Sequence, residues 1–491
     1  MVFSSLFFLF YFLPVTLALY FVCSFSRTLQ NIWLLIASLL FYAWGEPLFV
    51  LVMLLSIIAN YGFGIWVDKW RESKETAYNI ISLAVVFNIG ILFVYKYLGF
   101  VVDNINYLVG FKLFSFSSPP LPLGISFFTF QALSYVIDVY RQTARVERNP
   151  FYVGLYIAFF PALVAGPIVR FADIAEQLRE RALNWDMFSS GCARFTIGVA
   201  KKVLIANTLA MIADRIFNLS AAGNHVMVVP SMLAWLGLIC YTLQIYFDFS
   251  SYSDMAIGLG RMFGFSLKEN FDYPYISKSA TEFWRRWHIS LSSWFREYVY
   301  IPLGGSRPKT AGGNDLEPGR RNFIIIRNLF VVWLLTGIWH GADWTFIIWG
   351  MWYFVVLLFE RVTRLTQRNI PVVVSHLYLL FVVAIGWMFF RSANFHDSLI
   401  YLANLFSLNN NGFYSDLAWV FIKENWVIIM LAFLFSTPFA RNLGQKLNDD
   451  MLGRWGALFS AMYPALLTAI YLISVTYLVK GNYKPFIYFN F

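Results

Sequence analysis

The stretch TEFWRRWHISLSSWFREYVYIPLGG, residues 281–305, decides the organisation of the chain together with NLFVVWLLTGIWHGADWTFIIWGMW at 328–352. Plotted at about 100° per residue, the first part places its aromatic side chains on one arc and its charged and serine side chains on the other. Ser279 and Glu282 match the S-x-x-E capping box that begins a helix. We therefore expect one continuous amphipathic helix, with His288 at the edge of its apolar face.

The second part is a long apolar run interrupted by a histidine. Residues are nearly all apolar from Phe323 to Gly337, where Trp339, His340 and Gly341 break the pattern. An imidazole amid hydrocarbon is costly to leave without a partner and marks a functional site. The alternative is a packing histidine held by hydrogen bonds. The two glycines would allow a helix or a ligand to approach closely.

The composition is that of a membrane protein. Hydrophobic residues make up 59% of the 491 and charged residues 13%, about half the share found in soluble globular chains. The net charge of +10 comes from basic residues between apolar runs, which indicates cytoplasmic loops and argues against nucleic-acid binding. The three cysteines are far apart and predict no disulfide framework, and the five histidines show no zinc-ligand spacing, so we expect no metal site.

Apolar runs long enough to reach across a bilayer recur along the whole chain. They predict an all-α polytopic membrane protein with about eleven transmembrane helices, forming a single domain over 1–491 with its core motifs at 122–353 and further helices at 373–491. Basic loops at 68–74, 141–148 and 307–321 place the N-terminus outside the cytoplasm. The runs are at about 3–24, 30–44, 47–67, 79–101, 121–140, 151–169, 228–249, 323–338, 343–359, 373–390, 423–438 and 457–479.

Two segments depart from simple spanning helices. The 151–169 segment has basic residues on both flanks and contains Pro161, Gly166 and Pro167, so we expect a re-entrant pair of half-helices. Residues 185–217 alternate apolar and polar positions with a helical period, which predicts an amphipathic helix on the cytoplasmic membrane surface. Broken and interfacial elements of this kind enclose a chamber or a pathway.

A group of polar residues follows the 228–249 run. Asp248 and Asp254 are its acidic members. One interpretation is a span that ends there and is capped by Ser and Asp. The other is that one of the two carboxylates orients a charged partner in a membrane chamber.

The two histidines predict acid–base chemistry. His288 and His340 lie on elements joined by one loop, so they can face one cavity, although packing roles are the alternative for both. An imidazole kept from water stays neutral and suits a general base that takes a proton from a hydroxyl. No G-x-S-x-G turn or Cys–His arrangement is present, which favours direct transfer of a group onto an acceptor hydroxyl over a covalent enzyme intermediate. We assign His340 as the general base and His288 as its orienting partner. The residues assigned to substrate binding are Arg285, Arg286, Arg296, Trp287, Trp339, Asp248 and Asp254. The arginines would lie at the cytoplasmic mouth, binding phosphates or lipid headgroups.

Several of these motifs resemble those of the membrane-bound O-acyltransferase family, in particular its alginate O-acetylation branch. The resemblance covers most of residues 1–350 and is weaker beyond, where GWMFFRS (386–392) carries it. The motifs are FWRRWHISLSSWFREYVYIPLGG, TGIWHGADWTFIIWG, PLGISFFTFQALSYVIDVYR (122–141), FFPALVAGPIVRF (159–171) and YFDFSSYSDMAIGLG (246–260).

The resemblance implies a fold, an activity and partners. It implies an essential buried histidine in the W-H-G motif, His340, and a second in W-H-I-S, His288. It implies an acyl group passing from a cytoplasmic thioester donor, acetyl-CoA, through a chamber in the bacterial inner membrane. Periplasmic partner proteins would place the acetyl group on a polysaccharide, and no cofactor would stay bound. Peptidoglycan or cellulose acetylation and D-alanyl transfer to teichoic acid are alternatives within the family.

Two alternative functions do not involve acyl transfer. A secondary transporter also suits broken helices and polar groups at mid-membrane, but no internal repeat supports it. A membrane scaffold without catalysis leaves His340 unexplained.

Overall fold

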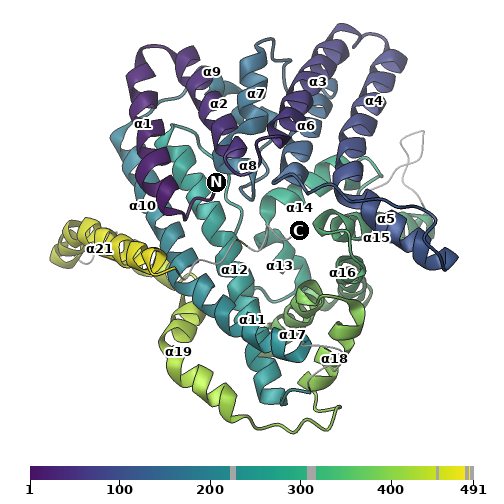
Figure 1. Ribbon diagram of the computed structural model, residues 1–491, viewed down its shortest axis with the longest axis vertical. Helices are drawn as coiled ribbons and strands as arrows, with labels where there is room; N and C mark the ends of the chain where they lie inside the picture. Colours follow the sequence, from purple (N-terminus) through teal and green to yellow (C-terminus); the bar gives the residue numbers. More distant parts are fainter. Residues whose placement is uncertain (222–227, 307–316, 449–452, 482–485, 487–491) are drawn as a thin grey trace. The chain divides into compact units, whose positions relative to one another are not determined.

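The computed structural model describes residues 1–221, 228–306, 317–448, 453–481 and Phe486, and among these it contains helices and no strands (Figure 1). The chain divides into two compact units, Met1–Phe195 with Tyr252–Glu269, and Thr196–Ser251 with Asn270–Phe491. The expectation of one domain stays a prediction.

The first unit consists of helices packed through small residues. Gly64 of α3 lies so close to the Tyr135 ring of α6 that an added Cβ would approach it to 2.6 Å. The helices α3, α4 and α6 accordingly lie side by side (Figure 1). The elements are α1 (Leu13–Val22), α2 (Arg27–Ala43), α3 (Phe49–Lys69), α4 (Lys74–Leu92), α5 (Leu98–Val109), α6 (Ile125–Tyr140), α7 (Pro150–Ala158), α8 (Phe160–Leu163) and α9 (Phe171–Arg179), with most of α10 (Trp185–Ala200) and the end of α12 (Ser231–Met262).

The second unit contains both histidines of the candidate site. Its helices are α11 (Asn207–Ala221), most of α12, α13 (Ala280–Arg286), α14 (Ile289–Phe295), α15 (Pro318–His340), α16 (Trp344–Thr363), α17 (Val372–Arg391), α18 (Phe395–Leu405), α19 (Asp416–Phe435), α20 (Phe439–Asn448) and α21 (Gly453–Val479). The basic loop expected at 307–321 falls largely on residues 307–316, outside the described residues.

Ten helices within the described ranges are long and apolar enough to cross a membrane. Nine of them coincide with predicted apolar runs, which confirms the all-α polytopic fold. The remaining helix spans Trp185–Ser220 and joins α10 to α11 through a π-helical turn at Lys201–Ala206. We expected a surface helix here, and that expectation is wrong, because the apolar positions of this helix pack inside the protein and Lys202 is buried.

The 151–169 segment is broken, as its prolines and glycine predicted. α7 ends at Ala158, Phe159 leaves the helical conformation, and only the four-residue α8 follows. Every residue from Tyr152 to Val169 is buried in the first unit. Non-helical backbone at membrane depth requires such cover. The side on which the segment emerges stays a prediction.

Candidate active site

His288 lies at a break between two short helices. The sequence predicted one continuous helix over this stretch, and that prediction is wrong: α13 ends at Arg286, and α14 begins at Ile289. His288 between them adopts the left-handed conformation, with φ 44° and ψ 54°. This conformation is uncommon for residues other than Gly, although Asn, Asp and His adopt it more often than the rest, and such residues concentrate at functional sites. The break turns the imidazole inward, so that His288 is 1% exposed.

Asn270 holds the imidazole of His288 in one orientation. The Oδ1 atom of Asn270 accepts hydrogen bonds from the backbone N–H of Ser290 at 3.1 Å and from its hydroxyl at 2.9 Å. The same oxygen lies 3.2 Å from Nδ1 of His288. Because the backbone N–H of Ser290 can only donate, this atom of Asn270 is the amide oxygen, and Nδ1 of His288 must donate to it. The Nε2 atom therefore carries the lone pair.

Burial keeps this imidazole neutral. Removal from water lowers the pKa of His288 from 6.5 to about 3. A neutral ring with its lone pair on Nε2 accepts a hydrogen bond from a hydroxyl, or takes its proton.

Glu360 fixes the beginning of α13. Its buried carboxylate accepts hydrogen bonds from the backbone N–H groups of Ala280, at 2.6 Å, and Thr281, at 3.0 Å. The hydroxyl groups of Thr281 and Tyr378 also donate to it, at 2.7 and 3.2 Å. A carboxylate is favourable at a helix N-terminus, where backbone N–H groups lack partners. The predicted cap forms beside it, because the Ser279 hydroxyl accepts from the backbone N–H of Glu282.

His340 is the last residue of α15 and is 5% exposed. The helix packs tightly against α16, since an added Cβ at Gly337 would come within 2.6 Å of the Phe346 carbonyl oxygen. An added Cβ at Gly341 would come within 2.2 Å of the Phe346 ring. The imidazole of His340 contacts Trp349 and Phe390 edge-on, with ring centroids 4.8 and 5.1 Å apart. The prediction that these glycines permit close approach of another helix is confirmed.

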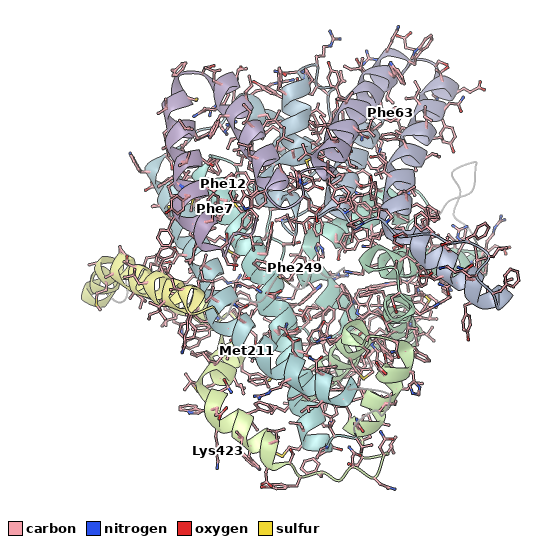
Figure 2. All side chains as sticks on the ribbon, in the orientation of Figure 1. Phe7, Phe12, Phe63, Met211, Phe249 and Lys423 are labelled. Atoms are coloured by element: carbon pink, nitrogen blue, oxygen red, sulfur yellow. The ribbon has the colours of Figure 1, made fainter. Side chains whose placement is uncertain are left out.

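Trp339 contacts both histidines. Its indole is 6.1 Å from the His288 ring and 4.8 Å from the His340 ring, measured between centroids. Phe249, labelled in Figure 2, also contacts His288, with ring centroids 4.6 Å apart. The structure therefore brings the two imidazoles into one aromatic surround. The shared cavity that the sequence predicted stays a prediction. Trp287, which we assigned to substrate binding, is buried and stacks on Phe283, so it forms part of this aromatic surround.

Three buried donors lie in the aromatic and polar cluster that contains the imidazoles. The Nδ2 amide of Asn270 and the indole N–H groups of Trp284 and Trp349 have no hydrogen-bond acceptor among the described residues. Native proteins pair almost all buried donors with protein or with water. These three donors are therefore available to water or to a polar substrate, and Trp349 lies directly against His340.

The three arginines do not act alike. Arg286 is ion-paired with Glu282 at 3.0 Å and with Asp272 at 3.2 Å, so it stabilises α13. Arg285 and Arg296 are exposed and have no ion-pair partner in the part of the chain that the structure describes. Only these two are available for an anionic ligand, and their place at a cytoplasmic mouth stays a prediction.

The two aspartates each bind a cation. α12 runs from Ser231 to Met262, so the interpretation of Asp248 as the cap of a span is wrong. Asp248 instead forms a buried ion pair with Lys202 at 2.5 Å. Asp248 directly precedes Phe249, which contacts His288. Asp254 belongs to the first unit and pairs with Arg194 at 2.9 Å.

Sequence reasoning missed Asn270, Glu360 and Lys202. Asn270 precedes Phe271 in an irregular segment, and no local pattern connects it to His288. Glu360 lies in the last turn of the apolar helix α16, where it resembles an ordinary charge near a helix end. Lys202 is one of the polar positions of the helix predicted to lie on the membrane surface. The sequence did contain one signal for the Lys202–Asp248 pair: a basic and an acidic residue each lie within a largely apolar segment, where a lone charge is costly.

These features define a multi-pass membrane protein that holds two buried imidazoles in one aromatic surround. The described residues include no group of histidine, cysteine and acidic side chains arranged to hold a metal ion. The chain belongs to the membrane-bound O-acyltransferase family, whose model matches residues 36–399.

Curated relatives carry related activities. The chain is 40% identical to the probable alginate O-acetylase AlgI of Pseudomonas putida, over 100% of both chains. It is 34% identical to the peptidoglycan O-acetyltransferase of Helicobacter pylori, over 83% of this chain and 80% of that one. It is 28% identical to the teichoic acid D-alanyltransferase of Bacillus subtilis, over 62% and 79%. The protein is thus a membrane O-acyltransferase, which excludes the transporter and scaffold interpretations.

Proposed function

We propose that this acyltransferase passes an acetyl group from acetyl-CoA on the cytoplasmic side across the bacterial inner membrane, for O-acetylation of an extracytoplasmic polysaccharide of the alginate type. The observation that carries the proposal is the similarity to a probable alginate O-acetylase along the full length of both chains. The peptidoglycan and teichoic acid enzymes are less similar and align over less of this chain.

His340 acts as the general base in this proposal. Its imidazole takes the proton of an acceptor hydroxyl, whose oxygen then attacks the thioester carbonyl carbon. A carbon–oxygen bond forms, the carbon–sulfur bond breaks, and the leaving thiolate takes the proton from the imidazolium. A positioned base contributes about 10²–10⁴-fold in rate.

His288 orients the acceptor. With Nδ1–H donated to Asn270, its Nε2 lone pair accepts a hydrogen bond from the hydroxyl before the proton moves to His340. The indole N–H of Trp349 is a donor suited to the oxygen that becomes negative as the carbonyl is attacked. The acceptor hydroxyl belongs to the polysaccharide or to a periplasmic partner protein that passes the acetyl group on.

A gene deletion separates the possible acceptors. In a strain without this gene, O-acetyl groups should disappear from the exopolysaccharide and remain on peptidoglycan, and the wild-type gene should restore them. Loss from peptidoglycan alone would contradict the alginate-type assignment and favour the alternative that the Helicobacter relative represents.

Sealed vesicles test the donor and the direction. Labelled acetyl-CoA supplied to the cytoplasmic face of inverted membrane vesicles should yield labelled acetyl ester in the lumen, while label supplied to the opposite face should not. Equal labelling from both faces would contradict transfer across the membrane.

A further inference from the structure

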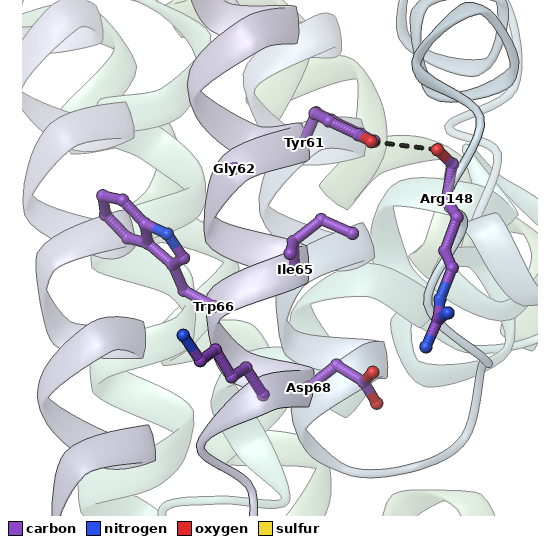
Figure 3. Close-up of a pocket in the computed structure, with 7 residues that line it drawn as sticks. Tyr61, Gly62, Ile65, Trp66, Asp68 and Arg148 are labelled. Atoms are coloured by element: carbon purple, nitrogen blue, oxygen red, sulfur yellow. Dashed lines mark hydrogen bonds between the residues drawn. The ribbon is translucent and has the colours of Figure 1, made fainter.

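A hollow of about 550 Å³ lies on one face of α3, within the first unit (Figure 3). Gly62 and Ile65 line it, and an added Cβ on Gly62 would meet no atom within 4 Å. The hydroxyl of Tyr61 donates to the carbonyl oxygen of Arg148 at 2.9 Å, the dashed line in Figure 3. This bond holds the loop that carries Arg148 beside the helix, so the hollow is built by two segments of the chain.

The rim of the hollow is basic. Lys69 and Arg148 line it and are exposed, and neither has an ion-pair partner among the described residues. Asp68 also lines the hollow, but its carboxylate lies 3.6 Å from Arg71, which balances its charge. Trp66 is half exposed and also lines the hollow; in Figure 3 it lies on the other side of α3 from Arg148. Indole rings favour the level of the lipid headgroups.

An apolar stripe leads to the hollow along the same face of α3. Leu51, Leu55 and Ile58 are each more than half exposed, and their spacing of four and three residues continues to Gly62 and Ile65. At about 1.5 Å per residue, the stripe is roughly 20 Å long, enough for the acyl chain of one leaflet.

We infer that this hollow is a binding site for an anionic phospholipid. The headgroup phosphate lies between Lys69 and Arg148, and an acyl chain follows the stripe. An arginine fork and a lysine ammonium are the protein groups that bind phosphate oxygens. Charge complementarity favours a headgroup with net negative charge. A soluble phosphate would use the same two cations without the stripe.

Gly62 offers a direct test with a matched control. An added Cβ meets no atom within 4 Å at Gly62, so a leucine side chain there would occupy part of the hollow; Gly90 of α4 is equally open around its Cβ position and does not line the hollow. The delipidated full-length protein is titrated with phosphatidylglycerol and, separately, with phosphatidylcholine, and bound lipid is counted by native mass spectrometry. Gly62→Leu should lose one tight phosphatidylglycerol, and Gly90→Leu should retain it. Lys69→Gln and Arg148→Gln should each weaken that binding about five-fold.

The outcomes separate the possible ligands. Equal phosphatidylglycerol binding by Gly62→Leu and Gly90→Leu would overturn the proposal, as would equal affinity of the wild type for phosphatidylcholine. Glycerol phosphate that competes as well as the lipid would show a soluble-anion site and would also overturn it. Size-exclusion profiles of all variants establish that each is folded.

Discussion

The buried imidazole of His288 predicts a specific loss of stability in acid. Its pKa is lowered to about 3 in the folded protein, against 6.5 when exposed to water. As the pH falls, the unfolded chain binds the proton first, so the folded state is fully stable above about pH 6.5 and loses stability down toward about pH 3. At about pH 5, which is about 1.5 units below the pKa of the unfolded chain, the folded state has lost about 2 kcal/mol of stability.

His288→Asn isolates this contribution. Asparagine tolerates the left-handed backbone, and its amide N–H can still donate to Asn270, so the substitution removes the titration and keeps the contact. The free energy of unfolding is measured in mixed micelles by titration with a denaturing detergent, at about pH 7 and at about pH 5. The wild type should lose about 2 kcal/mol more than the variant over this interval. An equal loss in both proteins would refute the idea that His288 is held neutral.

Three further predictions concern structure and topology. Lys202→Met should cost about 3–5 kcal/mol, because it leaves Asp248 charged and buried, while adding Asp248→Leu should recover most of this cost in the same unfolding assay; an equally unstable double variant would contradict the ion-pair account. Glu360→Gln should destabilise the protein by about 1–3 kcal/mol and raise the KM for the acceptor by loosening α13, and unchanged KM and stability would show that the cap does not position His288. Cysteines introduced at 148 and 174 should react with an impermeant thiol reagent from one and the same side if 151–169 is re-entrant, whereas labelling from opposite sides would show an ordinary span.

The fold was largely predictable from the sequence, because membrane insertion depends on local composition. Uninterrupted apolar runs and the helix-breaking residues Pro161 and Pro167 are visible in the sequence alone. The surface helix predicted at 185–217 failed, since its polar positions include Lys202, whose partner Asp248 lies far along the chain. Hydrophobic periodicity does not distinguish a charge facing water from one paired with a distant residue.

The site was predictable in its residues and less so in its geometry. His340 and His288 stand out by chemistry alone, and the structure places both against Trp339. The amphipathic pattern predicted an unbroken helix through His288, because the positions on both sides keep the helical period. The backbone turns there since Asn270 binds Ser290, a contact between irregular segments that no local pattern contains.

The most direct test of the central claim is acetyl incorporation by His340→Ala. Acetyl ester in the polysaccharide and the amount of protein in the membrane are measured together, with His396→Ala, an exposed histidine of α18, as the matched control. His340→Ala should lower acetylation by at least about 10²–10⁴-fold at normal membrane abundance. His288→Ala should have a milder effect, and His396→Ala none. Near-normal acetylation by a well-accumulated His340→Ala protein would contradict the assignment of His340 as the general base.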